Sequence, residues 1–170
     1  MKRIPLSLFT FLFLLSGLCA APTKTVWQIG EKNHSASELA LSPDKYKEFL
    51  ANDFGWEDRF YIIGLSSPQK DFPYVLPGPA DHWGGTSYTA GIRTHVLNIL
   101  FGMKEVPETD SWKLIIDLLD THYEFPALFK ITINGKSWKY ALPKGSGKSI
   151  DGDYSQIKPH TIEILLNAGV

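Results

Sequence analysis

The dipeptide Asn134-Gly135 lies between two β-prone runs, at residues 128–133 and 136–142. Asn and Gly readily adopt the positive φ angles of a type I′ turn, so this arrangement is the strongest short-range signal for a β-hairpin. A third run, at residues 112–119, places Trp or aliphatic side chains at every second position, which is typical of a strand with one buried face. The chain is therefore predicted to be built mainly from strands.

The remaining regular structure is predicted from shorter signals. Ser35 and Glu38 have the spacing of a capping box, and Ser42-Pro43 resembles the start of a helix that ends before Gly55. The 14 Gly and 11 Pro favour a loop-rich β fold over a helical bundle. We therefore expect an all-β sandwich with one or two short helices near the N-terminus. Further strands are predicted at residues 25–30, 59–65, 93–101 and 161–166.

The first twenty residues are predicted to be a secretory signal peptide. Lys2 and Arg3 precede an apolar run at residues 4–15, and cleavage after Ala20 would fit the small residues that follow. The run is shorter than the ~20 residues that a membrane-spanning helix needs. The protein is therefore expected to be secreted or periplasmic, with residues 21–170 forming one domain.

The only cysteine, Cys19, lies inside this segment. Leu18 directly before it is too bulky for a good lipoprotein site, so secretion is favoured over lipid attachment. The domain at residues 21–170 contains no cysteine, which excludes disulfides, thiolate catalysis and zinc–thiolate sites there.

The overall charge argues against a nucleic-acid partner. The chain has 17 basic and 18 acidic side chains, and loss of Lys2 and Arg3 with the signal peptide would leave a net charge of −3 (15 − 18). Broad electrostatic attraction to phosphate backbones needs an excess of basic residues.

Residues 66–92 form a long stretch rich in Pro and Gly, and stretches of this length inside a domain are either functional or disordered. Aromatic side chains within or beside it could stack on sugar rings, and nearby polar groups could hold the hydroxyls. The alternative is that the aromatic residues fold inward and fix the loop. The candidate carbohydrate-binding residues are Trp83, Tyr88, Tyr74, Trp56, Arg93, His82 and Asp81.

The best enzymatic constellation is Arg93, His95 and Tyr88. Elimination at a uronate needs a cation to neutralise the carboxylate and a base to remove the neighbouring proton. Arg93 and His95 would share one face of a strand at residues 93–101. The competing interpretation, which we favour, is that they mark the point where the core meets solvent, so no catalytic residue is assigned.

No metal or cofactor is assigned from the sequence. The acidic pairs Glu57-Asp58 and Asp151/Asp153 could hold a structural Ca²⁺, but such pairs are more often solvated loop residues. The histidines lack zinc-site spacing. The sequence at 145–149, GSGKS, resembles a phosphate-binding loop only superficially, because Leu142 occupies the position of its first glycine.

Four motifs in order carry a family resemblance: Trp27-Gln28-Ile29-Gly30, Tyr61-Ile62-Ile63-Gly64, the strand from Trp112 to Asp117, and Ile131-Thr132-Ile133-Asn134-Gly135. The chain from Thr25 to Val170 is similar to the carbohydrate-binding-like jelly-roll domain of rhamnogalacturonan lyases and related bacterial polysaccharide lyases. The resemblance implies a galactose-binding-like jelly roll and an acidic plant polysaccharide as ligand. It also implies that one or two strands are missing after Val170 and that the catalytic lyase domain is absent.

Three functions follow as expectations. The first is a secreted domain that binds acidic polysaccharide or oligosaccharide of the pectin or rhamnogalacturonan type, with a catalytic lyase domain as a possible partner. The second is a lyase that itself cleaves uronate linkages by β-elimination. The third is a purely structural domain of a truncated lyase.

Overall fold

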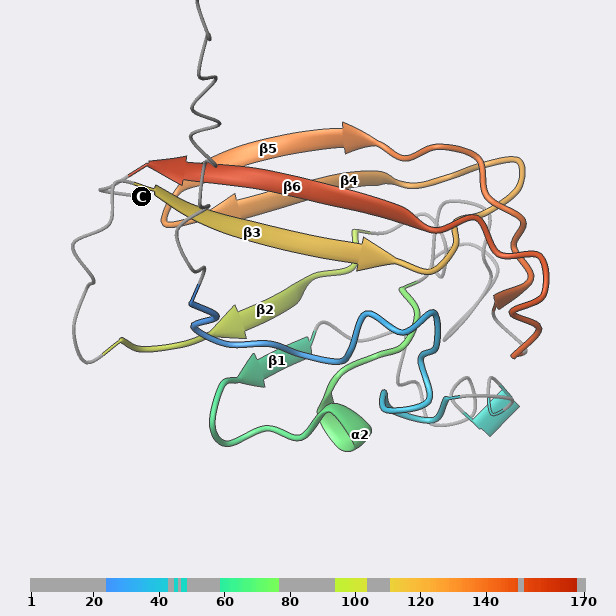
Figure 1. The fold of residues 1–170 in the computed structure, drawn as a ribbon, viewed down its shortest axis with the longest axis horizontal. Coiled ribbons are helices and arrows are strands. Elements are labelled where there is room, and N and C mark those ends of the chain that lie inside the picture. Colours follow the sequence, from blue (N-terminus) through green and yellow to red (C-terminus); the bar gives the residue numbers. More distant parts are fainter. Residues whose placement is uncertain are drawn as a thin grey trace, which may run out of the picture.

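The computed structural model describes residues 24–42, 45, 47–48, 59–76, 94–103, 111–149 and 152–167. Strands dominate these residues, and little of them is helical (Figure 1). The prediction of an all-β domain is confirmed, and the jelly-roll topology stays a prediction. The elements are β1 (Arg59–Ile62), α2 (Pro68–Asp71), β2 (Leu97–Leu100), β3 (Ser111–Leu118), β4 (Leu128–Ile133), β5 (Lys136–Ala141) and β6 (His160–Asn167).

The β4/β5 hairpin forms where the Asn-Gly signal predicts it. Asn134 has φ 46° and Gly135 has φ 84°, the left-handed conformations that a two-residue type I′ turn requires. The register pairs Ile133 with Lys136 next to the turn and Leu128 with Ala141 at the open end. The hairpin prediction is therefore confirmed to within one residue at its C-terminal end.

The main core lies between two antiparallel ribbons. β3 pairs with β6 over eight residues, and both strands alternate between exposed side chains and side chains that are wholly or partly buried. The buried residues Ile162 and Ile164 of β6 pack with Ile131 of β4. Half-buried antiparallel ribbons exclude water by packing their apolar side chains against one another in this way. Partly buried residues complete the cluster: Leu114, Ile116, Leu118, Phe129, Ile133, Trp138, Tyr140, Leu142 and Leu166.

A third ribbon pairs β1 with β2 in parallel, with Arg59 opposite Leu97. Both strands are shorter than predicted, and β2 does not begin at Arg93. The ladder starts where the Arg59 N–H donates to the Val96 carbonyl oxygen. His95 therefore precedes the strand, and Arg93, with which it was predicted to share a strand face, lies outside the described residues.

Residues 25–30 were predicted as a strand and do not form one. Side chains take the backbone groups that a ladder would use: Gln28 Nε2 donates to the Gly30 carbonyl oxygen at 2.7 Å, and the Glu31 N–H donates to Glu38 Oε1 at 2.8 Å. Trp27 instead packs its ring against Phe101, with centroids 5.3 Å apart.

The two helical predictions near the N-terminus have different outcomes. A turn forms at residues 37–38, and Ser35 Oγ accepts from the Ser37 N–H, as expected of a residue that caps a short turn. Glu38 does not complete the capping box, because its carboxylate accepts from the Glu31 N–H instead. The helix predicted from Ser42 falls mostly outside the described residues, and residues 47–48 are helical. The described helix α2 begins at Pro68, a residue suited to the first helical position.

Candidate functional site

Most of the residues predicted to bind carbohydrate or act in catalysis lie outside the described residues. Tyr74 follows α2 and is half-buried, and His95 precedes β2 and is also half-buried; each has contacts within the structure. The acidic pair Glu57-Asp58 and Asp151 are likewise outside the described ranges. The predicted residues that the structure does not describe are Trp56, Asp81, His82, Trp83, Tyr88 and Arg93.

Two loops meet at the end of the domain opposite the hairpin turn. The β3–β4 loop, residues 119–127, and the β5–β6 loop, residues 142–159, both lie at the right-hand end of Figure 1. The strand registers place them there, because Leu118 pairs with His160 and Leu128 pairs with Ala141. Residues far apart in the sequence therefore form one surface, which we call the loop end.

Asp120 organises the loop end. Its carboxylate accepts hydrogen bonds from the Ser146 N–H at 2.7 Å, from Ser146 Oγ at 2.5 Å and from the Lys148 N–H at 3.1 Å. Two N–H groups of the GSGKS sequence thus donate to the protein's own carboxylate, and those of Gly145 and Gly147 donate to the carbonyl oxygens of His122 and Thr121. They are not free to cradle a phosphate, which gives a physical reason for setting the phosphate-loop resemblance aside.

These bonds change the acidity of Asp120. Partial burial acts to raise the pKa of its carboxyl, but the hydrogen bonds from Ser146, Thr121 and Lys148 outweigh burial and hold the pKa below its usual range. Asp120 is therefore a stable anion at neutral pH. Its carboxylate holds the loop in shape. Because the hydrogen bonds that it accepts lower its pKa, it is poorly suited to act as a base.

Gly145 is the residue that lets the two loops approach this closely. It is buried, and a Cβ atom at this position would collide with the backbone of Thr121 and the carboxylate of Asp120. Gly147, with φ 67°, then carries the chain past the ring of Tyr123. Small residues are therefore needed where the β5–β6 loop crosses the β3–β4 loop.

Gly145→Ala is expected to destabilise the protein by about 1–3 kcal/mol, because the added methyl group forces the two loops apart. Gly102→Ala is the matched control, since a Cβ there meets nothing within 4 Å. Chemical denaturation of both variants measures the difference. Equal stability of the two variants would show that the loops do not cross as described.

His122 fixes the exposed aromatic residues of the β3–β4 loop. Its Nδ1 accepts from the Glu124 N–H at 3.1 Å and from the Phe125 N–H at 2.9 Å, and its ring stacks on Tyr123 with centroids 4.6 Å apart. Tyr123 nevertheless remains 59% exposed, and Phe125 remains 53% exposed. Large aromatic side chains held rigidly in solvent are the groups that stack on sugar rings.

An open pocket of about 470 Å³ lies beside Tyr123 and is lined also by Ser146, Gly147 and Lys148. Its lining residues include an aromatic residue and a lysine, while the Ser146 hydroxyl already donates to Asp120. A ring can pack on the apolar face of a pyranose, and the ammonium can pair with a carboxylate on the same sugar. The chemistry of this pocket fits an acidic sugar.

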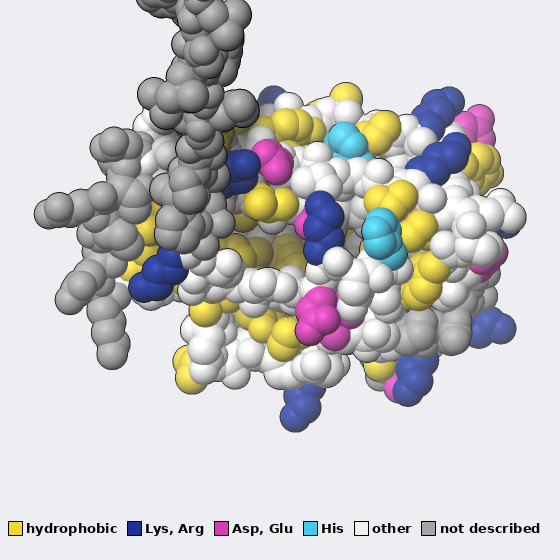
Figure 2. Space-filling view, in the orientation of Figure 1, with side chains coloured by type: hydrophobic (Ala, Val, Ile, Leu, Met, Phe, Trp, Pro, Cys, Tyr) yellow, Lys and Arg dark blue, Asp and Glu magenta, His cyan; other side chains and the backbone are white. Residues whose placement is uncertain are grey.

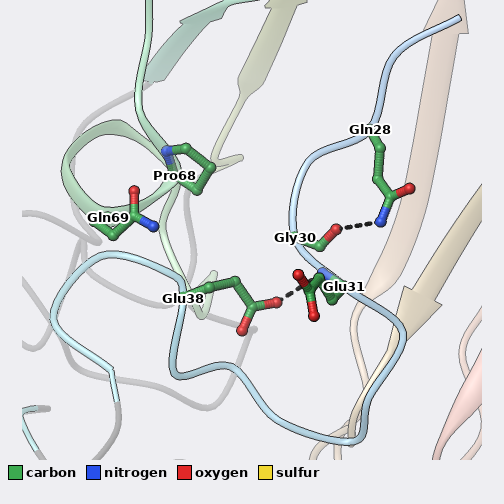
Figure 3. A pocket seen from close by; sticks show the side chains of 6 residues that line it. All are labelled: Gln28, Gly30, Glu31, Glu38, Pro68 and Gln69. Atoms are coloured by element: carbon green, nitrogen blue, oxygen red, sulfur yellow. Dashed lines mark hydrogen bonds between the residues drawn. The ribbon is translucent and has the colours of Figure 1, made fainter.

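A second pocket, of about 270 Å³, has a different character (Figure 3). It lies between the segment at residues 28–31, Glu38, and Pro68 and Gln69 of α2. Glu38 Oε1 is held by the Glu31 N–H, and Glu38 Oε2 is buried without a hydrogen-bond partner among the described residues. Two carboxylates and the absence of an aromatic wall make this pocket unfavourable for a uronate, so we place the candidate site at the loop end.

Neither Tyr123 nor Lys148 was predicted to be functional. The sequence did carry signals: His122-Tyr123 and Phe125 lie between two well-predicted strands, and GSGKS is rich in residues that loops use at ligand sites. What the sequence could not show is that Asp120 brings these two loops together.

The described residues offer no metal site of three or more His, Asp or Glu side chains. Asp153, one of the residues considered for Ca²⁺, accepts from the N–H and Oγ of Ser155. None of the helices in the described ranges has both the length and the apolar surface needed to cross a bilayer.

Comparison with known proteins gives one finding. A family model described as "CBM-like: Polysaccharide lyase family 4, domain III" matches residues 25–163. Neither the curated proteins nor the solved structures include a significant match to the chain. The matched residues include β3, the β4/β5 hairpin, the loop end and the first half of β6.

Proposed function

The chain belongs to the CBM-like domain III family of polysaccharide lyase family 4, and on that premise we propose that it is a secreted domain that binds acidic plant polysaccharide of the pectin or rhamnogalacturonan type. Membership of a CBM-like family supports a role in carbohydrate binding or one associated with it. The apolar run before Ala20 supports secretion.

One observation supports the loop end as the proposed binding site. Tyr123 is 59% exposed beside an open pocket that Ser146 and Lys148 also line. Aromatic stacking supplies affinity for the sugar ring, and the Lys148 ammonium supplies a preference for a carboxylate-bearing sugar. The long loop at residues 66–92, with Trp83 and Tyr88, remains a second proposed contact region.

Tyr123→Ala is expected to weaken binding to galacturonate oligomers by roughly 5- to 30-fold, the equivalent of one stacking contact of about 1–2 kcal/mol. Calorimetry or affinity electrophoresis in gels containing pectin fragments measures the change. Phe60→Ala is the matched control, because Phe60 is an aromatic residue that is 61% exposed on β1.

The outcomes separate the two proposed contact regions. Weaker binding by Tyr123→Ala but not by Phe60→Ala supports the loop end. If Trp83→Ala weakens binding and Tyr123→Ala does not, the site belongs to the long loop instead. A native chain that migrates unretarded on every glycan tested would leave the binding role without support.

A further inference from the structure

The outer face of the β4/β5 hairpin carries two lysines directly opposite each other. The register pairs Lys130 with Lys139, and both side chains are exposed. Side chains at opposed positions of an antiparallel pair have Cβ atoms about 4.5–5.5 Å apart, and like charges on directly opposed residues destabilise the sheet. The hairpin therefore holds a concentrated positive charge at an energetic cost.

No carboxylate in the described part of the chain relieves this charge. The six outward side chains of the hairpin are Leu128, Lys130, Thr132, Ser137, Lys139 and Ala141, and none of them is acidic. No salt bridge joins either lysine to a described residue. All six residues are exposed, so the face is open to a large ligand.

The other ribbon provides a direct contrast. On the outer face of β3/β6, Lys113 Nζ lies 2.9 Å from Glu163 Oε2, and Lys32 Nζ lies 2.7 Å from Asp117 Oδ1. In the view of Figure 2, basic and acidic side chains lie next to one another on the molecular surface. Charges on the β3/β6 ribbon are thus neutralised within the protein, whereas the opposed pair on the hairpin is not.

Hydroxyl groups extend the lysine pair along the same face. Thr132 Oγ1 and Ser137 Oγ form a hydrogen bond of 2.8 Å one pair nearer the turn. Toward the loop end, Leu128 is 67% exposed and lies three residues after the exposed Phe125. Alternate residues of a strand lie about 6.6–6.8 Å apart. Along the hairpin, the outer face therefore presents an apolar pair, then the lysine pair, then the hydroxyl pair nearest the turn.

We propose that this hairpin face, centred on Lys130 and Lys139, is a binding surface for a linear anionic polysaccharide, separate from the Tyr123 pocket. An acidic group placed between the two ammonium groups relieves their repulsion and gains two charge-assisted contacts. Carboxylates of uronic acids and sulfate esters share this chemistry. The inference deepens the proposed carbohydrate-binding role and rests on it for the choice of a glycan as ligand.

The experiment compares the full chain with the double variant Lys130→Gln/Lys139→Gln. Lys24→Gln/Lys70→Gln is the control, since it removes the same charge from two exposed lysines outside the hairpin. Binding is measured to polygalacturonate, to a sulfated galactan and to a neutral galactan. We expect the hairpin variant to lose on the order of 10-fold in affinity for the acidic polymers and nothing for the neutral one.

Reversing the charge of Lys139 distinguishes a lysine pair that binds a ligand from one that stabilises the hairpin. Lys139→Glu places a carboxylate opposite Lys130, so the melting temperature is expected to rise by about 1–3 °C while binding to acidic polymers falls. A structural lysine would give the opposite change in stability or none.

The outcomes are decisive in either direction. Equal affinity of the native chain and the hairpin variant for acidic polymers would overturn the inference, even if Tyr123→Ala weakens binding and the proposed function stands. Equal losses in the hairpin and control variants would also overturn it, because only net charge would then matter. The ratio between polygalacturonate and sulfated galactan identifies which acidic group the surface prefers.

Discussion

Replacing Asp120 by alanine is expected to destabilise the protein by about 2–3 kcal/mol and to abolish the pocket beside Tyr123. The substitution removes the acceptor for the Ser146 N–H, Ser146 Oγ and the Lys148 N–H, which are hydrogen bonds to a charged group and therefore among the stronger ones. The estimate is well below the sum of three such bonds, because the loop end is partly exposed and water replaces some of the lost contacts.

Amide hydrogen exchange measures this directly. The amides of Ser146 and Lys148 should exchange much faster in Asp120→Ala than in the native chain. Asp153→Ala is the control, since Asp153 carries the same charge but, within the described ranges, its carboxylate accepts hydrogen bonds only from Ser155. Unchanged protection at Ser146 and Lys148 in Asp120→Ala would contradict the role given to Asp120.

The same substitution makes a prediction about pH. The pKa of Asp120 is lowered in the folded protein, so its contribution to stability is present above the unfolded value of about 3.9 and is lost as the pH falls through the folded value. The stability difference between the native chain and Asp120→Ala should therefore be constant near neutral pH and shrink below about pH 4. Asp117 and Asp153, whose pKa values are also lowered, are present in both proteins and cancel from this difference.

The elements that the sequence predicts well are those whose signals are local. Asn134-Gly135 determines its own turn geometry, and the strand from Ser111 to Leu118 carries an alternation that matches its exposed and partly buried faces residue by residue. β6 is predicted for the same reason. In each case the pattern of the segment itself decides which face meets the core.

The predictions that failed depend on contacts that a strand pattern does not show. Residues 25–30 have strand-forming composition, but Gln28 Nε2 donates to the Gly30 carbonyl oxygen two positions away, and the Glu31 N–H donates to Glu38 seven positions away. β2 begins at Leu97, where its pairing with Arg59 of β1 begins, and not at Arg93 as the sequence predicts. The candidate site depends on Asp120 meeting Ser146, a contact across 26 positions that no local pattern reveals.

The largest effect on stability is expected from Ile164→Ala, at about 2–5 kcal/mol. Ile164 is only 2% exposed and packs between the β3/β6 ribbon and the β4/β5 hairpin, so removing its side chain leaves a cavity that the two layers cannot readily close. Both layers support the loop end. We therefore expect Ile164→Ala to lower the free energy of unfolding of the whole domain, which should still unfold in a single transition.

Leu165→Ala is a control of almost ideal geometry, because Leu165 is the next residue on the same strand and is 69% exposed. It should change stability by about 0.5 kcal/mol or less. Urea denaturation of the two variants also tests the register of the ribbon. A shift of β6 by one residue against β3 would exchange its two faces. A larger loss of stability in Leu165→Ala than in Ile164→Ala would therefore mean that the register is wrong.

Glycan binding by the folded fraction of Ile164→Ala should remain close to native. The Tyr123 pocket is formed where Asp120 joins the two crossing loops, and Ile164 does not line it.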